Sequence, residues 1–121
     1  MPYVDGFVLT VPKKNVAAYR RMATAAGKIW RKHGALEFRE CQGDDLKSKP
    51  GWGVPFPKLA KAKTGETVFF SYIVYKSRAH RDKVNKAVMK DPRFFSMMMN
   101  EKKPFDLSRM SMGGFKVLVD A

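Results

Sequence analysis

The sequence predicts an α+β fold of the ferredoxin-like type, a four-stranded antiparallel sheet with two helices on one face. Two observations carry this prediction. Strand-like and helix-like segments follow one another in the order strand, helix, strand, strand, helix, strand, the split βαβ arrangement. The chain has 121 residues, which fit one domain, 1–121, and leave no room for a second.

The first strand and the first helix are separated by a change in apolar period at Pro12. Residues 3–11 are apolar and partly β-branched, and Pro12 closes them, so we expect a strand. Between Lys14 and His33 the apolar side chains recur at helical spacing, and most of the basic ones fall on the other side. Gly34 then ends the helix.

A short alternating strand and a long connection come next. Residues 35–41 alternate, with Phe38 on one side and Arg39 on the other, which is typical of a half-buried strand. Residues 43–65 hold several prolines and glycines around Trp52 and Phe56. A loop this long is a flap over a site, an arm that grips a partner, or a disordered segment, and the sequence leaves all three open.

The second half of the chain repeats the strand–helix–strand pattern. Residues 66–75 form the strongest strand signal of the chain. Ser77 is the expected N-cap of a helix to Lys90, and Asp91-Pro92 caps and opens a short helix to Met99. A last strand is expected over about 111–119.

The third strand predicts a dimer, because both of its faces are apolar. Phe70 and Tyr72 lie on one face, and Phe69 and Ile73 lie on the other. Two helices cover only one face of a sheet, so the open face needs a partner. A second copy is the economical cover, which predicts a homodimeric α/β barrel around a twofold axis.

The charge balance raises nucleic acid or another anion as a partner. Lys and Arg number 24 against 11 Asp and Glu, a net charge of +13. There is no acid between Asp5 and Glu37, so the helical basic residues form a candidate polyanion face; the alternative is a solvated surface. The candidate residues are Arg20, Arg21, Arg31 and Lys32.

Composition also limits where the protein works. A single cysteine excludes an internal disulfide framework and fits a reducing compartment. The longest apolar run is far too short to cross a bilayer, so we expect a soluble cytoplasmic protein without a membrane partner. His33 and His80 have no metal-binding spacing to Cys, Asp or each other, and we expect no metal and no cofactor.

A candidate pocket follows from the expected strand faces. If Phe38 faces the helices, alternate residues of its strand face the barrel interior, and we expect the first strand to place Asp5 there too. With Tyr72 and a guanidinium before the last strand, these groups suit a small, anionic molecule. The alternative is that the charged members pair with one another. The candidates are Asp5, Glu37, Arg39, Cys41, Tyr72 and Arg109.

Four segments together resemble the bacterial DUF1428 (YbaA-like) family: MPYVDGFVLTVPKKN, ALEFREC, VFFSYIVYKSRAHRDKVNKAVMKDPR and KPFDLSRMSMGGFKVLVD. The resemblance covers nearly the whole chain and is weakest over 43–65. It departs at Leu107-Ser108, where the family pattern has a Gly-Lys pair. The resemblance implies a dimeric, ferredoxin-like α/β barrel. It implies no reaction, because the family is uncharacterised, and no catalytic residues.

The sequence leaves three functions open. The leading hypothesis is a homodimer that binds a small molecule in a barrel or interface pocket. The alternative is an RNA- or DNA-binding protein that uses the basic helix face. A cofactor-independent monooxygenase or isomerase is the third, since such enzymes occupy similar barrels. Whether the chain is an enzyme is not decided by its residues.

Overall fold

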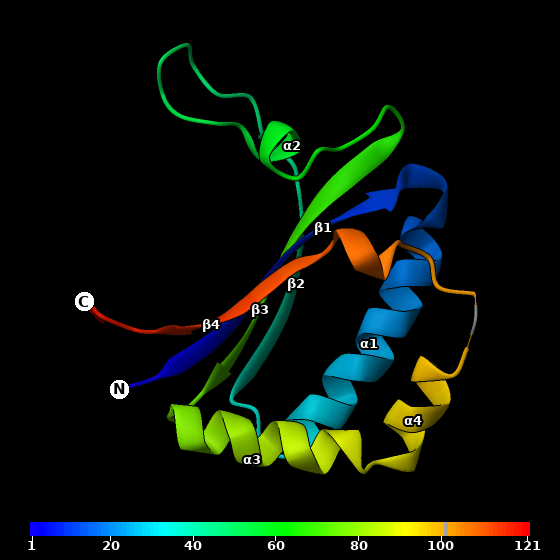
Figure 1. Ribbon diagram of the computed structural model, residues 1–121, viewed down its shortest axis with the longest axis vertical. Helices are drawn as coiled ribbons and strands as arrows, with labels where there is room; N and C mark the ends of the chain where they lie inside the picture. Colours follow the sequence, from blue (N-terminus) through cyan, green and yellow to red (C-terminus); the bar gives the residue numbers. More distant parts are fainter. Residues whose placement is uncertain (101) are drawn as a thin grey trace.

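Four antiparallel strands form one sheet, and the three longer helices lie on the same side of it (Figure 1). The computed structural model describes residues 1–100 and 102–121. The strands lie in the order β2-β3-β1-β4, which is the ferredoxin-like order and confirms the predicted sheet. Their bounds are Tyr3–Pro12 for β1, Glu37–Gln42 for β2, Glu66–Tyr75 for β3 and Ser111–Lys116 for β4.

The helices begin and end where local chemistry places them. The Ser77 hydroxyl accepts a bond from the His80 N–H (3.1 Å), and the Asp91 carboxylate accepts one from the Arg93 N–H (2.9 Å). Gly34, at φ +113°, ends the first helix. The helices are η1 Lys13–Asn15, α1 Val16–Lys32, α2 Phe56–Leu59, α3 Arg78–Met89, α4 Pro92–Met98 and η2 Leu107–Arg109. None in the described part of the chain is long and apolar enough to span a membrane.

The structure differs from the sequence prediction at the end of the last strand. β4 ends at Lys116 rather than near Val119, because its partner β1 begins at Tyr3. The Val117 N–H still donates to the Pro2 carbonyl (3.1 Å), and the pairing between the two segments ends there. The short helices η1, α2 and η2 were not predicted.

The face of β1 was also predicted wrongly. Asp5 pairs with Ile73 and Phe7 pairs with Ser71, and these partners belong to the face that the helices cover. Asp5 is 7% exposed and therefore lies under the helices rather than on the open face. The error has a physical cause: both faces of β1 are apolar, so only its pairing with β3 decides which one is buried.

The hydrophobic core consists of two separate clusters. One cluster lies under α3 and the C-terminal half of α1, and it contains Ile29, Ala35, Ile73, Tyr75, Val84 and Val88. The other lies under the N-terminal half of α1, and it contains Leu9, Val11, Tyr19, Ala23 and Phe69. Phe7 packs against both clusters yet is itself only partly buried. The interior between them is therefore not filled by side chains.

Residues 43–65 form an arm that projects from the side of the sheet opposite the helices (Figure 1). Its base is fixed: the Gly43 N–H donates to the Val68 carbonyl (2.8 Å), and the Phe56 ring contacts Phe70 with centroids 6.4 Å apart. Its outer part carries Trp52, which is 79% exposed. The arm thus buries one of its two aromatic side chains only in part and leaves the other uncovered.

Candidate functional site between the sheet and the helices

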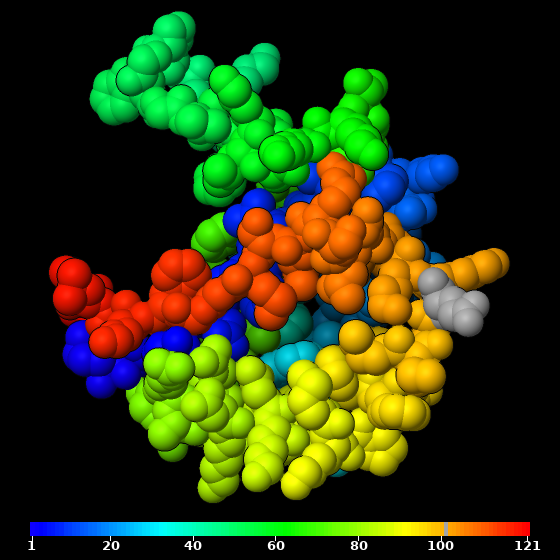
Figure 2. Space-filling model, viewed as in Figure 1, coloured from blue at the N-terminus to red at the C-terminus, as the bar shows by residue number. Residues whose placement is uncertain are grey.

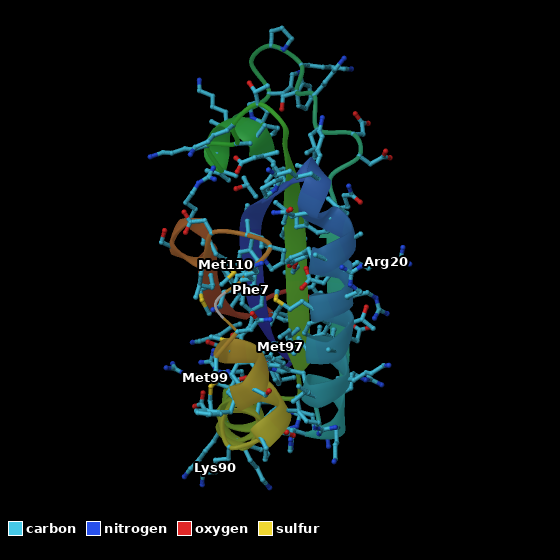
Figure 3. The ribbon with its side chains drawn as sticks, turned by 90° about the vertical axis from the view of Figure 1, so that its right-hand side faces the viewer. Phe7, Arg20, Lys90, Met97, Met99 and Met110 are labelled. Atoms are coloured by element: carbon cyan, nitrogen blue, oxygen red, sulfur yellow. The ribbon has the colours of Figure 1, made fainter. Side chains whose placement is uncertain are left out.

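A cavity of about 380 Å³ separates the two core clusters. It lies between the helix-covered face of the sheet, α1, α4 and the segment that leads into η2. The space-filling view shows a hollow between η2 and α4 (Figure 2). In the view turned by 90° about the vertical axis, Phe7 lies between Met97 and Met110 (Figure 3), and all three side chains line the cavity.

The wall of the cavity is mainly apolar, and methionine and aromatic side chains make up about half of its lining residues. Six of the eight methionines of the chain line it: Met22, Met89, Met97, Met98, Met110 and Met112. Phe7, Trp30 and Phe94 add flat aromatic surface. Methionine is flexible and polarisable, so such a wall adapts to the outline of an apolar molecule.

One partly buried polar cluster lies in this apolar wall, around Glu40. The Tyr19 hydroxyl donates to Oε1 of Glu40 (2.7 Å), and the Ser71 hydroxyl donates to the same oxygen. Burial raises the pKa of the Glu40 carboxyl, and the two hydrogen bonds only partly oppose that rise. Burial beside this carboxylate also raises the pKa of Tyr19. Tyr19 therefore remains a hydrogen-bond donor at neutral pH.

A second polar cluster borders the cavity near α3. Arg81 donates to Oδ1 of Asp5 (2.6 Å), and its guanidinium lies 4.9 Å from the centroid of the Tyr3 ring. Oδ1 of Asn85 accepts from the Trp30 indole (3.1 Å) and from the Tyr75 hydroxyl (3.2 Å). Asp5 thus has a cationic partner within the chain.

Four of the six residues predicted for a pocket lie together on the open face of the sheet, the face on which the sequence placed them. The β2–β3 register puts Glu37, Arg39 and Cys41 on the same face as Tyr72. Glu37 and Arg39 form an ion pair at 3.6 Å in which both side chains are about half exposed. Cys41 is exposed. Asp5 lies on the other face, and of these four residues only Arg39 also lines the cavity that Asp5 borders.

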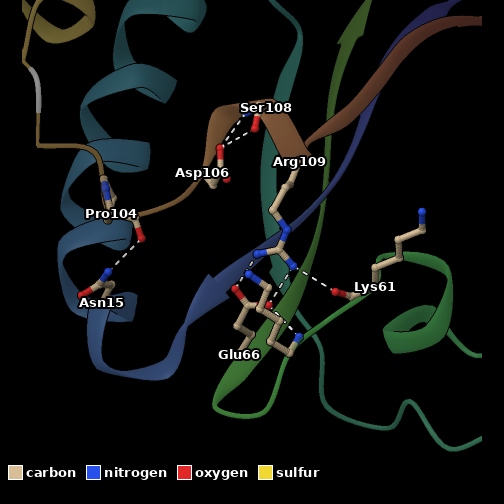
Figure 4. A network of polar contacts seen from close by, with 8 residues as sticks. Asn15, Lys61, Glu66, Pro104, Asp106, Ser108 and Arg109 are labelled. Atoms are coloured by element: carbon tan, nitrogen blue, oxygen red, sulfur yellow. Dashed lines mark hydrogen bonds and ion pairs between the residues drawn. The ribbon is translucent and has the colours of Figure 1, made fainter.

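Arg109 uses its guanidinium within the chain (Figure 4). It donates to both carboxylate oxygens of Glu66 (2.7 and 2.9 Å) and to the Lys61 carbonyl (2.9 Å). The pairing lowers the pKa of Glu66 to about 2. The guanidinium that was expected to bind a ligand is therefore occupied by Glu66.

Comparison with known proteins assigns the chain to a family. Residues 2–107 match the model described as "Protein of unknown function (DUF1428)". The chain belongs to the DUF1428 family. It is 41% identical over 120 residues to "Uncharacterized protein YbaA" of Escherichia coli strain K12, covering 99% of both chains. The same identity and coverage hold for YbaA of Shigella flexneri. The resemblance seen in the sequence is confirmed.

Solved structures show that the DUF1428 chain shares its fold with distant proteins. Rv0793 from Mycobacterium tuberculosis aligns with a TM-score of 0.55 at 13% identity, covering 100% of this chain and 99% of that one. Atu4242 from Agrobacterium tumefaciens gives 0.56 at 14%, covering 96% and 92%. A variant of SnoaB, described as a cofactor-independent oxygenase from Streptomyces nogalater, gives 0.53 at 12%, covering 98% and 95%. At these identities the likeness concerns the fold alone.

Sequence reasoning missed the polar cluster of this DUF1428 protein, although one signal was present. Phe38 was correctly expected to face the helices, and strand alternation then places Glu40 on the same face. A carboxylate at a position that should be apolar is the observation that points to a site. Ser71, between Phe69 and Ile73, gives the same signal on β3.

The basic face of α1 borders a second, more open depression of about 610 Å³ between α1 and β2. Arg20, which Figure 3 shows on α1, and Arg31 line this depression. Arg21 and Lys32 are also exposed. In the part of the chain that the structure describes, none of these four side chains forms an ion pair. Glu40 borders both this depression and the cavity.

Proposed function

We propose that this DUF1428 protein is a cytoplasmic homodimer that binds a small, largely apolar molecule in the cavity of each copy. The single observation that carries the proposal is the division of the core by a cavity of about 380 Å³. Protein interiors pack as densely as organic crystals, and an unfilled core costs stability. An exposed free thiol, Cys41, supports a reducing compartment.

The size and lining of the cavity define the ligand class. A cavity of about 150 Å³ lined by aliphatic and aromatic side chains holds one benzene ring. The volume here therefore suits a molecule of about two fused rings. Its apolar wall with a few converging polar groups is the usual composition of a small-molecule site.

Naphthalene is a suitable probe of this site, read by NMR of protein labelled with ¹³C at the methionine methyl groups. The signals of Met97 and Met110, which line the cavity, should shift on titration. Those of Met1 and Met99, which do not line it, should stay in place. Absence of any shift among the cavity methionines at saturating naphthalene would contradict the proposal.

A matched pair of variants on α1 locates the binding site. Ala26 lines the cavity, whereas the neighbouring Ala25 is exposed on the outside of the same helix. Ala26→Phe should fill the cavity and abolish naphthalene binding, and Ala25→Phe should leave it unchanged. Equal loss in both variants would place the binding elsewhere.

The open face of the sheet supports the second half of the proposal, a homodimer. Phe70 and Phe115 are 46% and 61% exposed there, beside the partly buried Val4, Tyr72 and Val74. Contiguous exposed apolar surface marks an interface. The arm projects on the same side (Figure 1); its Phe56 contacts Phe70 of the open face, and its outer part carries the exposed Trp52.

Charge supports a second copy as the occupant of this face. The chain carries +13, so two copies repel each other unless they meet through a neutral surface. The charged residues on the strands of the open face are Glu37, Arg39 and Glu66. Glu37 pairs with Arg39, and Glu66 pairs with Arg109. The exposed cations of α1 lie on the opposite, helix-covered side. The strands of the open face therefore present no unpaired charge to a second copy.

Sedimentation equilibrium tests the homodimer. The wild type should sediment at twice the 13.8 kDa chain mass. Phe70→Lys, in the centre of the open face, should give the monomer. Phe95→Lys is the control, since Phe95 is 63% exposed but lies on α4. A wild-type monomer, or a dimer that survives Phe70→Lys, would contradict the interface.

Polyanion binding by α1 is the second candidate, favoured by four exposed cations without ion-pair partners in the described residues. Exchanging Arg20, Arg21, Arg31 and Lys32 for Glu should abolish binding to RNA and leave naphthalene binding intact. Ala26→Phe should do the reverse. RNA binding that is unaffected by the charge reversal would exclude this face.

A cofactor-independent oxygenase or isomerase reaction is the third candidate, and SnoaB bears the first of these descriptions. Such chemistry needs a proton acceptor beside the ligand. The partly buried Glu40 carboxylate in the cavity wall is a group of that kind.

A further inference from the structure

The position of Glu40 is unusual for an ionisable side chain. It lies on the helix-covered face of β2, in a row across the sheet with Ser71 and Phe7. Its neighbours on that face of the strand are Phe38 and Gln42. Carboxylates in such surroundings are rare, because burial without a partner is costly.

The two oxygens of the Glu40 carboxylate differ in the hydrogen bonds that they accept. Oε1 accepts from both Tyr19 and Ser71. Oε2 accepts from no donor in residues 1–100 and 102–121. No buried side-chain oxygen or nitrogen of these residues lacks a hydrogen-bond partner, so Oε2 is not enclosed. It borders open space, either the cavity or the depression beside α1.

The two donors also fix the orientation of the carboxylate. Tyr19 comes from α1 and Ser71 from β3, so Oε1 is held from two elements. A carboxylate anchored through one oxygen presents the other in a defined direction. Oε2 is thereby prepared to accept a hydrogen bond from a bound molecule.

The charged and titratable groups around Glu40 leave its charge unpaired. Tyr19 of α1 faces it directly, and Arg20, Lys28 and Arg31 of the same helix border the depression. Asp5 of β1, Arg39 of β2 and Lys103 before η2 border the cavity, and Arg39 pairs with Glu37. None of these cations is within ion-pair distance of Glu40. A hydrogen-bond donor on the ligand would therefore offset part of the cost of burial.

We infer that Oε2 of Glu40 is the recognition group of the cavity and accepts the acidic hydroxyl of a fused-ring phenol or enol. This inference rests on the proposed small-molecule function. A hydroxyl is favoured over an ammonium group because Lys103 and the cations of α1 surround the approach. An O–H···O⁻ bond in an apolar cavity is short and strong, so it selects the hydroxyl-bearing ring over the bare hydrocarbon.

The experiment compares 2-naphthol with naphthalene on the same ¹³C-methionine protein. At pH 7 the wild type should bind 2-naphthol about ten- to a hundred-fold more tightly than naphthalene, the range for a hydrogen bond to a charged group. Glu40→Gln should lose most of this preference. Glu37→Gln, on the open face of the same strand, should keep it.

The pH profile of the wild type gives an independent readout that does not depend on the folding of a variant. Burial raises the pKa of Glu40, and protonation at Oε2, the oxygen without a donor, converts this hydrogen-bond acceptor into a hydroxyl group. Affinity for 2-naphthol should therefore fall as the pH is lowered through that pKa, while affinity for naphthalene stays level.

Each outcome bears on one proposal. Equal affinity for the two compounds, or a preference that Glu40→Gln retains, overturns the role of Glu40 and leaves the cavity as a binding site. Binding of neither compound, with unmoved Met97 and Met110 signals, overturns the proposed function itself. A hydroxyl preference with a pH-independent affinity overturns the ionised carboxylate as the acceptor.

Discussion

Each face of the sheet carries side chains that its surroundings disfavour, and the two faces do so in opposite ways. The helix-covered face carries polar side chains in an apolar layer: Asp5, Glu40 and Ser71. The open face carries apolar side chains in contact with water, with Phe70 and Phe115 the most exposed. A polar group in an apolar layer indicates a ligand, and an exposed apolar patch indicates a partner. One sheet can therefore serve two separate purposes.

Strand geometry keeps these purposes apart. Successive side chains point to opposite faces, so neighbouring residues of one strand belong to different environments. A substitution at one position tests one face, and its neighbour provides the control. The first two of the four predictions that follow use this property.

The largest effect is expected from a pair on β1. Leu9→Ala removes a side chain that is 2% exposed in the core, and it should lower the free energy of unfolding by about 2–5 kcal/mol. Val8→Ala, one residue away on the open face, should cost about 1 kcal/mol or less. Urea denaturation of both variants measures the difference. Similar losses would show that the open face is as well packed as the core.

Two neighbouring glycines of β4 test the same difference between the covered face and the open face. Here the substitution adds a methyl group instead of removing side-chain atoms. An added Cβ at Gly114 would meet three atoms of the Tyr3 ring and hydroxyl at less than 3 Å, whereas at Gly113 the nearest atom is on Phe115 at 3.9 Å. Gly114→Ala should destabilise by about 1–3 kcal/mol. Gly113→Ala should be close to neutral. Thermal melting distinguishes them, and a neutral Gly114→Ala would mean that Tyr3 moves freely.

The next effect depends on pH and concerns Glu66. Its pairing with Arg109 lowers the pKa from 4.5 to about 2 in the folded state. A lowered pKa gives stability that is present above the unfolded value of 4.5 and is lost as the pH falls toward 2. Glu66→Gln should therefore lower the melting temperature at pH 6, and the difference from wild type should shrink near pH 2.

The control for this prediction lies on the open face. Glu37 pairs with Arg39 at 3.6 Å in an exposed position, so Glu37→Gln should leave the pH dependence of melting unchanged. A curve for Glu66→Gln that runs parallel to the wild type throughout would rule out the Arg109 pair as a source of acid sensitivity.

The smallest effect is expected at Cys41. Its side chain is exposed on the open face, and it makes no hydrogen bond among the described residues. Cys41→Ser should change the free energy of unfolding by no more than about 0.5 kcal/mol. A loss of several kcal/mol in chemical denaturation would reveal a buried role that its exposure does not suggest.

The parts of the fold that the sequence predicts are those with strong local signals. β3 is correct to the residue, and Ser77 and Asp91 cap their helices as expected. Local chemistry decides these features. The face of β1 was wrong because Val4 and Val8 compete with Leu9 and Val11 on equal terms, and only pairing with β3 resolves the choice.

The site was less predictable, because its members meet only in three dimensions. Tyr19, Glu40 and Ser71 come from three elements, and Arg109 meets Glu66 from 43 residues away. No spacing in the sequence encodes such contacts. The cavity lies where the two core clusters are not in contact. The placement of the helices over the sheet produces this gap, and no single residue does.

Arg109 has a consequence for communication between the arm and the cavity. Its guanidinium hydrogen-bonds Glu66 and the Lys61 carbonyl, which lie where the arm returns to the sheet. These contacts connect the base of the arm to η2. Leu107 and Met110, on either side of that contact, line the cavity. A partner that fixes the position of the arm therefore also restricts the position of Leu107 and Met110 in the cavity wall. Thermodynamic reciprocity then requires that any gain in ligand affinity on dimerisation be matched by an equal gain in dimer affinity on ligand binding.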